Sequence, residues 1–245
     1  MSLLTRMFDL YTIIPAVLML FTCMPVRAYA QAWVATKCGD DTPRQMGRLT
    51  LNPLKHLDLF GSIALILFRF GWTKPLPIQR RNFKNYKRDS ALVAAAGPIS
   101  TFLMAFILTI VLRILNNVIF GMGVTNGFVQ GVYIGIQTMV SINLWLTFLS
   151  LLPFPPFDGG VIISSLLPGR VYYKVSAFFQ KYQGIITVAV LVLFYMGILS
   201  IPISFLSNLT FQLFWWLCSP IDMLFGIPSQ PVTEGVQLAI RLFGL

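Results

Sequence analysis

Long apolar runs with at most one charged residue recur along the chain. Four of them reach the roughly 20 residues that an α-helix needs to cross a bilayer: residues 10–34, 91–115, 132–152 and 184–206. A fifth run, 209–226, is long enough but contains Pro220 and Asp222, so it either spans the membrane or lies partly in the interface. The pattern predicts an all-α polytopic membrane protein. We expect one membrane domain over residues 1–230 and an amphipathic C-terminal tail over residues 231–245.

A shorter apolar stretch, residues 59–72, has the length of a re-entrant or interfacial segment rather than of a span. Basic residues flank it on both sides, and positive charge favours the cytoplasmic face of a membrane. We therefore predict that residues 37–88 are cytoplasmic, that the short segment enters the membrane without crossing it, and that the N-terminus lies outside. Residues 116–131 hold no Lys or Arg and fall outside, whereas the following basic loop, from Arg170 to Lys181, falls inside.

Composition strengthens the membrane assignment. The chain is 56% hydrophobic and 11% charged, whereas soluble domains carry about 25% charged residues. The net charge of +10 would suit nucleic acid in a soluble protein, but eleven of the eighteen basic residues fall between Lys37 and Arg88. Such a cluster is expected of a segment that faces anionic lipid. We therefore expect the lipid bilayer as a partner, and no nucleic acid.

The N-terminal segment has a second interpretation. Arg6, the apolar run after it and the small residues Ala28-Tyr29-Ala30 resemble a secretory signal with its cleavage site. Against this, the charged Arg27 stands directly before that site, and residues 32–35 prolong the same apolar run. We favour a membrane helix that is retained.

The end of the third apolar run carries the most informative motif. Residues 151–160 read Leu-Leu-Pro-Phe-Pro-Pro-Phe-Asp-Gly-Gly, which must break helical backbone at membrane depth, and such a break requires cover by protein or a wet cavity. Asp158 is costly there unless it is paired or binds a metal, so it is a candidate functional residue. The alternative is a water-exposed Asp in a turn at the membrane edge. The candidate scaffold residues of this motif are Pro153, Pro155, Pro156, Gly159 and Gly160.

This motif resembles the hallmark segment of the site-2 protease family of intramembrane zinc metalloproteases, in which the Asp is a zinc ligand. Further segments are similar, in order and spacing, to the bacterial small-membrane-protease branch of that family: residues 39–42, 47–58, 70–77 and 96–100, the last of which contains Gly97 and Pro98. The similarity runs from about residue 12 to about residue 206. It implies a site-2 protease-like transmembrane core in a bacterial cell membrane.

The resemblance also implies that the zinc-binding HExxH motif of the family has been lost. The family's HExxH motif places two zinc-binding His and a Glu base on one helix face, and the matching positions here are Arg27, Ala28 and Gln31. His56 is the only histidine in the chain, so no shifted motif exists. Two positions where the family usually has Asn near the active centre are Thr101 and Ser150.

These replacements predict a pseudoprotease. Asp158 is the one family ligand that is retained, and Arg27 beside it would repel a dication, so we expect no bound zinc although zinc belongs to the family. We predict instead that Arg27 and Asp158 form an ion pair. The alternative is that Arg27 snorkels to the interface.

Three functions are compatible with these observations. The leading hypothesis is a catalytically inactive site-2 protease homologue that binds transmembrane helices or other partner proteins. The second is an active zinc protease with unconventional ligands such as Asp158, Gln31 and Cys23. The third is a small permease or membrane assembly subunit, although the predicted spans offer few polar residues for a path.

Overall fold

The computed structural model describes residues 17–61, 74–122 and 127–225, and every regular element in these ranges is helical. The helices are α3 (Met24–Lys37), α4 (Thr42–Gln45), α6 (Tyr86–Met122), α7 (Gly127–Ser150), α8 (Asp158–Leu166), α9 (Gly169–Tyr195), α10 (Ser200–Leu217) and α11 (Pro220–Phe225). Shorter turns are a π-helical one at Met19–Cys23 and two 3₁₀ turns at Pro53–Lys55 and Arg80–Asn82. Within the described residues, four stretches are long and apolar enough to cross a membrane: Tyr86–Ile119, Phe128–Ser150, Gly169–Tyr195 and Ser200–Met223. The prediction of an all-α polytopic membrane protein is confirmed.

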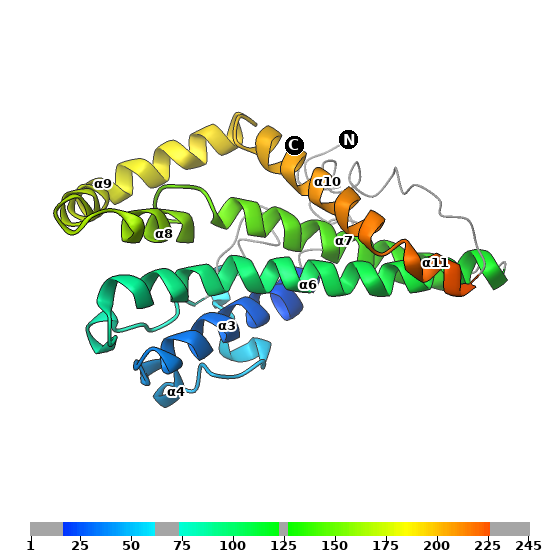
Figure 1. Ribbon diagram of the computed structural model, residues 1–245, viewed down its shortest axis with the longest axis horizontal. Helices are drawn as coiled ribbons and strands as arrows, with labels where there is room; N and C mark the ends of the chain where they lie inside the picture. The colour runs from blue at the N-terminus through cyan, green and yellow to red at the C-terminus, as the bar shows by residue number, and fades with distance from the viewer. Residues whose placement is uncertain (1–16, 62–73, 123–126, 226–245) are drawn as a thin grey trace.

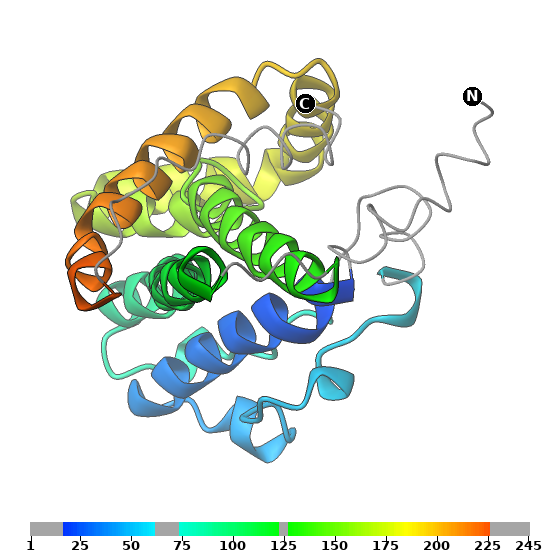
Figure 2. The same ribbon diagram turned by 90° about the vertical axis from the view of Figure 1, so that its right-hand side faces the viewer.

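The longest helix, α6, is the element on which the others pack. It runs along the length of the molecule, with α3 and α4 on one side and α7 to α10 on the other (Figure 1). Figure 2, which looks down the axis of α6, shows α3 and α10 on different sides of it. The core among α6, α7 and α10 consists of Ala105, Leu112, Val140, Leu144, Phe211, Phe214 and Trp215. This arrangement places the candidate functional site between α3, α6 and the start of α8.

Helix α3 ends in a Schellman turn at Gly39, whose φ of +110° suits glycine. The N–H groups of Gly39 and Asp40 donate to carbonyl oxygens of the last turn of α3, at 3.2 and 3.0 Å. The turn directs the buried carboxylate of Asp40 toward the segment that precedes α6. There it accepts hydrogen bonds from the N–H of Gln79 at 2.7 Å and from Nδ2 of Asn82 at 2.9 Å. Asp40 therefore joins two segments that lie about 40 residues apart in sequence.

The segment predicted to be re-entrant, residues 59–72, lies mostly outside the described residues. Its flanks are described and are tied together, because the N–H of Lys74 donates to the carbonyl oxygen of His56 at 2.9 Å. His56 is itself buried, and its Nε2 atom lies 2.8 Å from the carbonyl oxygen of Thr50. Asp40 holds residues 79–82 as well, so the chain on both sides of the segment is bonded to residues that precede it.

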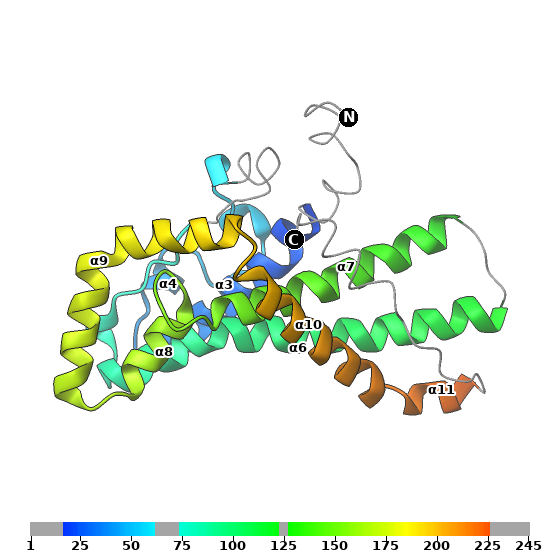
Figure 3. The same cartoon turned by 90° about the horizontal axis from the view of Figure 1, so that it is seen from above.

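The predicted span 184–206 does not correspond to one helix. Helix α9 stops at Tyr195 and α10 starts at Ser200, because the chain makes a second Schellman turn at Gly197, with a φ of +77°. The N–H groups of Gly197 and Ile198 close this turn on carbonyl oxygens of α9, at 3.0 and 3.1 Å. The basic stretch from Arg170 to Lys181, predicted as a loop, is the first half of α9, and Figure 3 shows this helix changing direction along its length.

The boundaries of the other predicted spans differ less from those of the observed helices. Helices α6 and α7 contain most of the predicted spans 91–115 and 132–152 and extend beyond them. The fifth run, 209–226, falls on the end of α10 and on α11. Residues 10–16 of the first predicted span and the predicted tail, 231–245, lie outside the described residues.

Candidate functional site

Two polar side chains of α3 meet the head of α8. Arg27 and Gln31 are four residues apart and therefore share one face of α3. The Nη2 atom of Arg27 donates to Oδ2 of Asp158, and the two side chains are 16% and 21% exposed. The Nε2 atom of Gln31 lies 3.3 Å from each carboxylate oxygen of Asp158. The structure thus brings together three of the residues singled out in the sequence, across a separation of 131 positions.

Asp158 takes this position because of the loop between α7 and α8. Pro153, Pro155 and Pro156 lack backbone N–H groups and cannot continue a helix, so the chain turns after Ser150 and starts again at Asp158. Two glycines let α8 begin directly against this loop. A Cβ atom on Gly159 would lie 2.2 Å from the carbonyl oxygen of Leu151, and one on Gly160 would lie 2.9 Å from the carbonyl carbon of Phe154.

The third wall of the site is bare backbone of α6. A Cβ atom on Gly97 would lie 2.7 Å from Nε2 of Gln31 and 3.0 Å from both Cζ of Arg27 and Oδ2 of Asp158. Pro98 follows inside the same helix and has no N–H to donate. Gly97 is therefore the position at which α6 makes room for all three polar side chains.

A hydroxyl network lies behind the ion pair. The Nη1 atom of Arg27 donates to Oγ of Ser150 at 3.3 Å, and that hydroxyl donates to the carbonyl oxygen of Thr147 at 2.9 Å. Thr101 and Thr147 join their hydroxyls at 2.7 Å. Both positions at which the family usually has Asn thus lie around the site, where their hydroxyls now satisfy backbone and side-chain groups.

The side chains of Cys23 and His56 make their hydrogen bonds to groups other than Arg27, Gln31 and Asp158. The Sγ atom of Cys23 is fully buried and accepts a hydrogen bond from Nδ2 of Asn143 at 2.9 Å. His56 closes the loop that contains Thr50. Ala28, between Arg27 and Gln31, contributes no polar group. In the part of the chain that the structure describes, no three His, Cys, Asp or Glu side chains gather so as to hold a metal ion.

A second buried charge pair was missed from the sequence. Arg113 of α6 and Asp222 of α11 are 1% and 4% exposed, and Nε of Arg113 lies 2.7 Å from Oδ1 of Asp222. Asn117 adds a hydrogen bond from Nδ2 to the same oxygen at 2.8 Å. The available signal was a single Arg within the predicted span 91–115 and a single Asp within the fifth run, because charges at membrane depth need partners.

The fold and the site define a class of protein: a helical membrane bundle in which an Asp after a proline-rich break faces two positions of one helix spaced four residues apart. Over 160 residues, the chain is 40% identical to the Bacillus subtilis (strain 168) protein named "Putative zinc metalloprotease YwhC", a match that covers 65% of this chain and 72% of that protein. The chain therefore belongs to the site-2 protease family of zinc metalloproteases. No protein-family model matches the chain, and no solved structure matches it.

Proposed function

We propose that this chain is a member of the site-2 protease family that does not cleave peptides and instead binds transmembrane segments of other membrane proteins. The observation that carries the proposal is the contact of Arg27 with Asp158. In the family, the residues matching Arg27, Gln31 and Asp158 ligate one zinc ion. Here a guanidinium engages the one carboxylate that is retained.

The chemistry of the donor set does not fit zinc. Zinc sites in proteins take Cys, His, Asp or Glu ligands, and catalytic sites keep three of them. Asp158 is one such ligand, Gln31 presents its NH₂ group to the carboxylate, and Arg27 stays protonated. Each unit-charge pair at about 4 Å costs roughly 4 kcal/mol at an effective dielectric of 20, so Arg27 opposes a dication. These contacts support a site that has exchanged its metal for an internal cation.

The site also lacks a general base. The family's Glu position is Ala28, whose side chain cannot accept a proton, and loss of a positioned base costs on the order of 10²–10⁴ in rate. Asp158 is the one carboxylate here, and it is engaged by Arg27 and Gln31. This supports binding without hydrolysis.

Zinc content of the full-length protein, purified in detergent without chelators, tests the proposal. We expect far less than one equivalent of zinc in the wild type, and no change in Asp158→Ala. One tightly held equivalent that is lost in Asp158→Ala would overturn the proposal, since Asp158 would then be a working ligand.

A stripe on α10 is the surface at which we place the binding of transmembrane segments. Its exposed apolar residues recur every three or four positions along one face of the helix: Ile201, Phe205, Leu209, Leu213 and Trp216. In a chain embedded in the bilayer such a face can pack against lipid or against a partner helix. A photo-crosslinking residue at Phe205 should trap intact membrane proteins in cells, whereas one at the buried Phe211 should not. Trapped fragments truncated within a transmembrane segment would instead indicate cleavage.

We also propose that residues 37–88 are cytoplasmic in a bacterial membrane, that the N-terminus lies outside, and that residues 1–230 form one domain. The backbone bond between His56 and Lys74 supports a common side for both basic blocks. Single cysteines at Gln45 and Asn85 should react with an impermeant maleimide only after the cytoplasmic face is opened. A cysteine at Phe128, beyond the far end of α6, is the control and should react in intact cells. Opposite reactivities at Gln45 and Asn85 would contradict the topology.

A further inference from the structure

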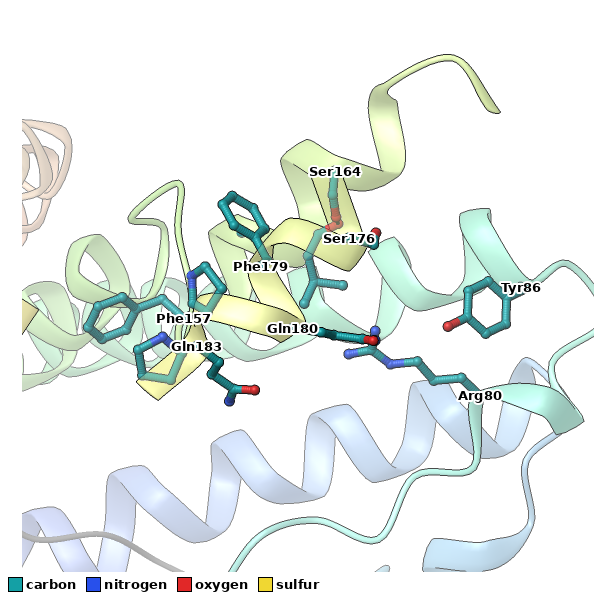
Figure 4. Close-up of a pocket in the computed structure, with 12 residues that line it drawn as sticks. Arg80, Tyr86, Phe157, Ser164, Ser176, Phe179, Gln180 and Gln183 are labelled. Carbon is teal, nitrogen blue, oxygen red and sulfur yellow. Dashed lines mark hydrogen bonds between the residues drawn. The ribbon is translucent and has the colours of Figure 1, made fainter. Parts of the chain in front are cut away.

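A cavity of about 370 Å³ lies beside the site, and the proposed function does not use it. Its walls come from the turn before α6, the loop before α8, α8 itself and α9. Figure 4 shows the side chains of Arg80 and Gln180 directed toward each other across it, with Gln183 nearby and Tyr86 at the outer edge. Its volume falls in the range of about 300–1,000 Å³ that is usual for sites of small ligands.

The lining of this cavity suits an anion. Arg80 is its one charged lining residue, and no Asp or Glu among the described residues contributes to the walls. The Arg80 side chain forms no ion pair within the described residues. The amide groups of Gln180 and Gln183, which can donate hydrogen bonds, line the same cavity. The hydroxyls of Tyr86 and Ser176 line it too, and both interact with Tyr172. A guanidinium with neighbouring neutral donors is well suited to bind phosphate oxygens through several bonds at once.

We infer the depth of the cavity in the membrane from the composition of α9. The helix starts with basic residues such as Arg170 and Lys174, passes Gln180 and Gln183 at the cavity, and continues as apolar, exposed surface at Ile185 and Val188, which are 68% and 61% exposed. Along a helix that enters a bilayer, this change from charged to apolar marks the interface. Basic pockets between transmembrane helices on the cytoplasmic side bind anionic lipid headgroups.

We propose that this cavity binds the phosphodiester headgroup of an anionic membrane lipid, with Arg80 as its principal contact. Gln180 and Gln183 donate to the remaining phosphate and headgroup oxygens, and the acyl chains lie on the apolar part of α9 beyond them. The cavity adjoins Asp158, since Phe157 and Gly160 line it and the charge of Arg80 also acts on that carboxylate. Asp158 itself is engaged by Arg27 and Gln31, so the proposal does not depend on whether the protein cleaves peptides.

Native mass spectrometry of the full-length protein tests this assignment. The protein is exchanged from phosphatidylcholine nanodiscs with or without phosphatidylglycerol into mild detergent, and the retained lipids are counted. Arg80→Gln removes the cavity's charge. Arg81→Gln is the matched control, because it removes the same charge from the neighbouring residue, which does not line the cavity. Gln180→Leu removes one donor without changing charge, and thermal unfolding confirms that each variant is folded.

We expect the wild type to retain one phosphatidylglycerol in preference to phosphatidylcholine. Arg81→Gln loses only the general attraction to an anionic surface, and Arg80→Gln should weaken retention about 10-fold further, as expected for a lost hydrogen bond to a charged group. Gln180→Leu should fall between the two. Equal losses in Arg80→Gln and Arg81→Gln, or equal retention of phosphatidylcholine, would overturn the site. Displacement of the lipid by millimolar inorganic phosphate would overturn the lipid as the source and assign the cavity to a soluble phosphate compound.

Discussion

Arg113 of α6 and Asp222 of α11 form a buried ion pair that links the long central helix to the last described helix. Two nitrogens of the guanidinium engage the two carboxylate oxygens, with Nε 2.7 Å from Oδ1. Asn117 donates to the same carboxylate, and the Cζ atom of Arg113 lies 4.0 Å from the centroid of the Trp215 ring. With its charges and donors engaged on several sides, the pair anchors α11 on α6.

Removing one member of this pair should destabilise the bundle. We expect Arg113→Met to lower the free energy of unfolding by about 3–5 kcal/mol, because it leaves Asp222 as an unpaired buried charge. Arg113→Met combined with Asp222→Leu should recover much of that loss. Unfolding in mixed micelles, followed by tryptophan fluorescence, measures both. Arg170→Met on the exposed start of α9 is the control and should be nearly neutral. A double variant as unstable as the single one would show that the pair is not the stabilising feature.

A side chain at Gly97 should destabilise the protein, although Gly97 lies inside a helix. Gly97→Ala would gain helix propensity, but its methyl group would meet Gln31, Arg27 and Asp158 within 3.0 Å or less. These contacts are side-chain atoms, so the site should shift and the net cost should be about 1–3 kcal/mol. Gly131→Ala is the control: apart from its chain neighbours and the backbone of its own helix, no atom lies within 4 Å of the new methyl group, and it should stabilise by about 0.5–1 kcal/mol. Equal effects of the two substitutions in thermal unfolding would contradict the packing described.

Asp40 should make the free energy of unfolding of the protein depend on pH. Burial opposes its ionisation, but hydrogen bonds from Thr42, Asn82 and Gln79 outweigh that effect and hold the pKa of Asp40 below its ordinary value of 3.8. A carboxyl group whose pKa is lowered by folding stabilises the folded state above its unfolded pKa, and that stabilisation is lost as the pH falls through the folded pKa. We therefore expect constant stability around neutral pH and a loss below pH 3.8.

The matched variants for this prediction are Asp40→Asn and Asp41→Asn. Asp40→Asn would direct an NH₂ group at other donors, so it should cost about 1–3 kcal/mol at neutral pH and flatten the acid dependence. Asp41 is exposed and lies 3.9 Å from Arg44, so Asp41→Asn should leave both unchanged. Thermal unfolding over a pH series measures the stability and its pH dependence. If the stability of Asp40→Asn still falls at acid pH as that of the wild type does, groups other than Asp40 cause the fall.

The sequence predicted the positions whose residue types are unusual inside an apolar run, but it did not predict which glycine ends a helix. The prolines and glycines around Asp158 can be recognised because they break a helix at a depth where breaks are rare, and the family resemblance implied that Arg27 lies near Asp158. Gly197 could not be distinguished from Gly184 in the same way. Both are single glycines in an apolar run, yet α9 continues through Gly184 and ends before Gly197. Pro202, in the first turn of α10, is the neighbour in sequence that separates the two cases, since a Pro is tolerated at the start of a helix but not in its interior.

The Arg113 and Asp222 pair illustrates a second limit. Each charge alone indicates that a partner must exist, but the sequence does not say which opposite charge lies within reach. Asp222 and Asp158 were both unassigned carboxylates in apolar surroundings, and a resemblance was informative for Asp158 alone. The partner of Asp222 became clear only from the contact between α6 and α11.

Restoring the family residues should restore zinc binding. We expect the triple variant Arg27→His, Ala28→Glu and Gln31→His to bind one zinc ion, because Gln31 Nε2 already lies 3.3 Å from both oxygens of Asp158. Two ligands of one tetrahedral zinc, each bonded at about 2.1 Å, are about 3.4 Å apart. Metal analysis after dialysis measures uptake, with Asp158→Ala added to the triple variant as the control. A folded triple variant without zinc would mean that these residues do not converge as ligands must.

The strength of the Arg27 and Asp158 pair should be measurable as a coupling energy. Arg27→Ala and Asp158→Ala each leave one charge unpaired in a mostly buried site, so each should cost about 3 kcal/mol, the lower end of the range for buried pairs. The double variant leaves no lone charge and should lose substantially less than the sum of the two. Arg44 and Asp41, which are 66% and 55% exposed and 3.9 Å apart, form the control pair. Their coupling should be about 0–1 kcal/mol, as is usual at a surface. Additive losses for Arg27 and Asp158 would mean that Arg27 snorkels away from the carboxylate, and the proposal that a guanidinium has replaced the metal would fail with it.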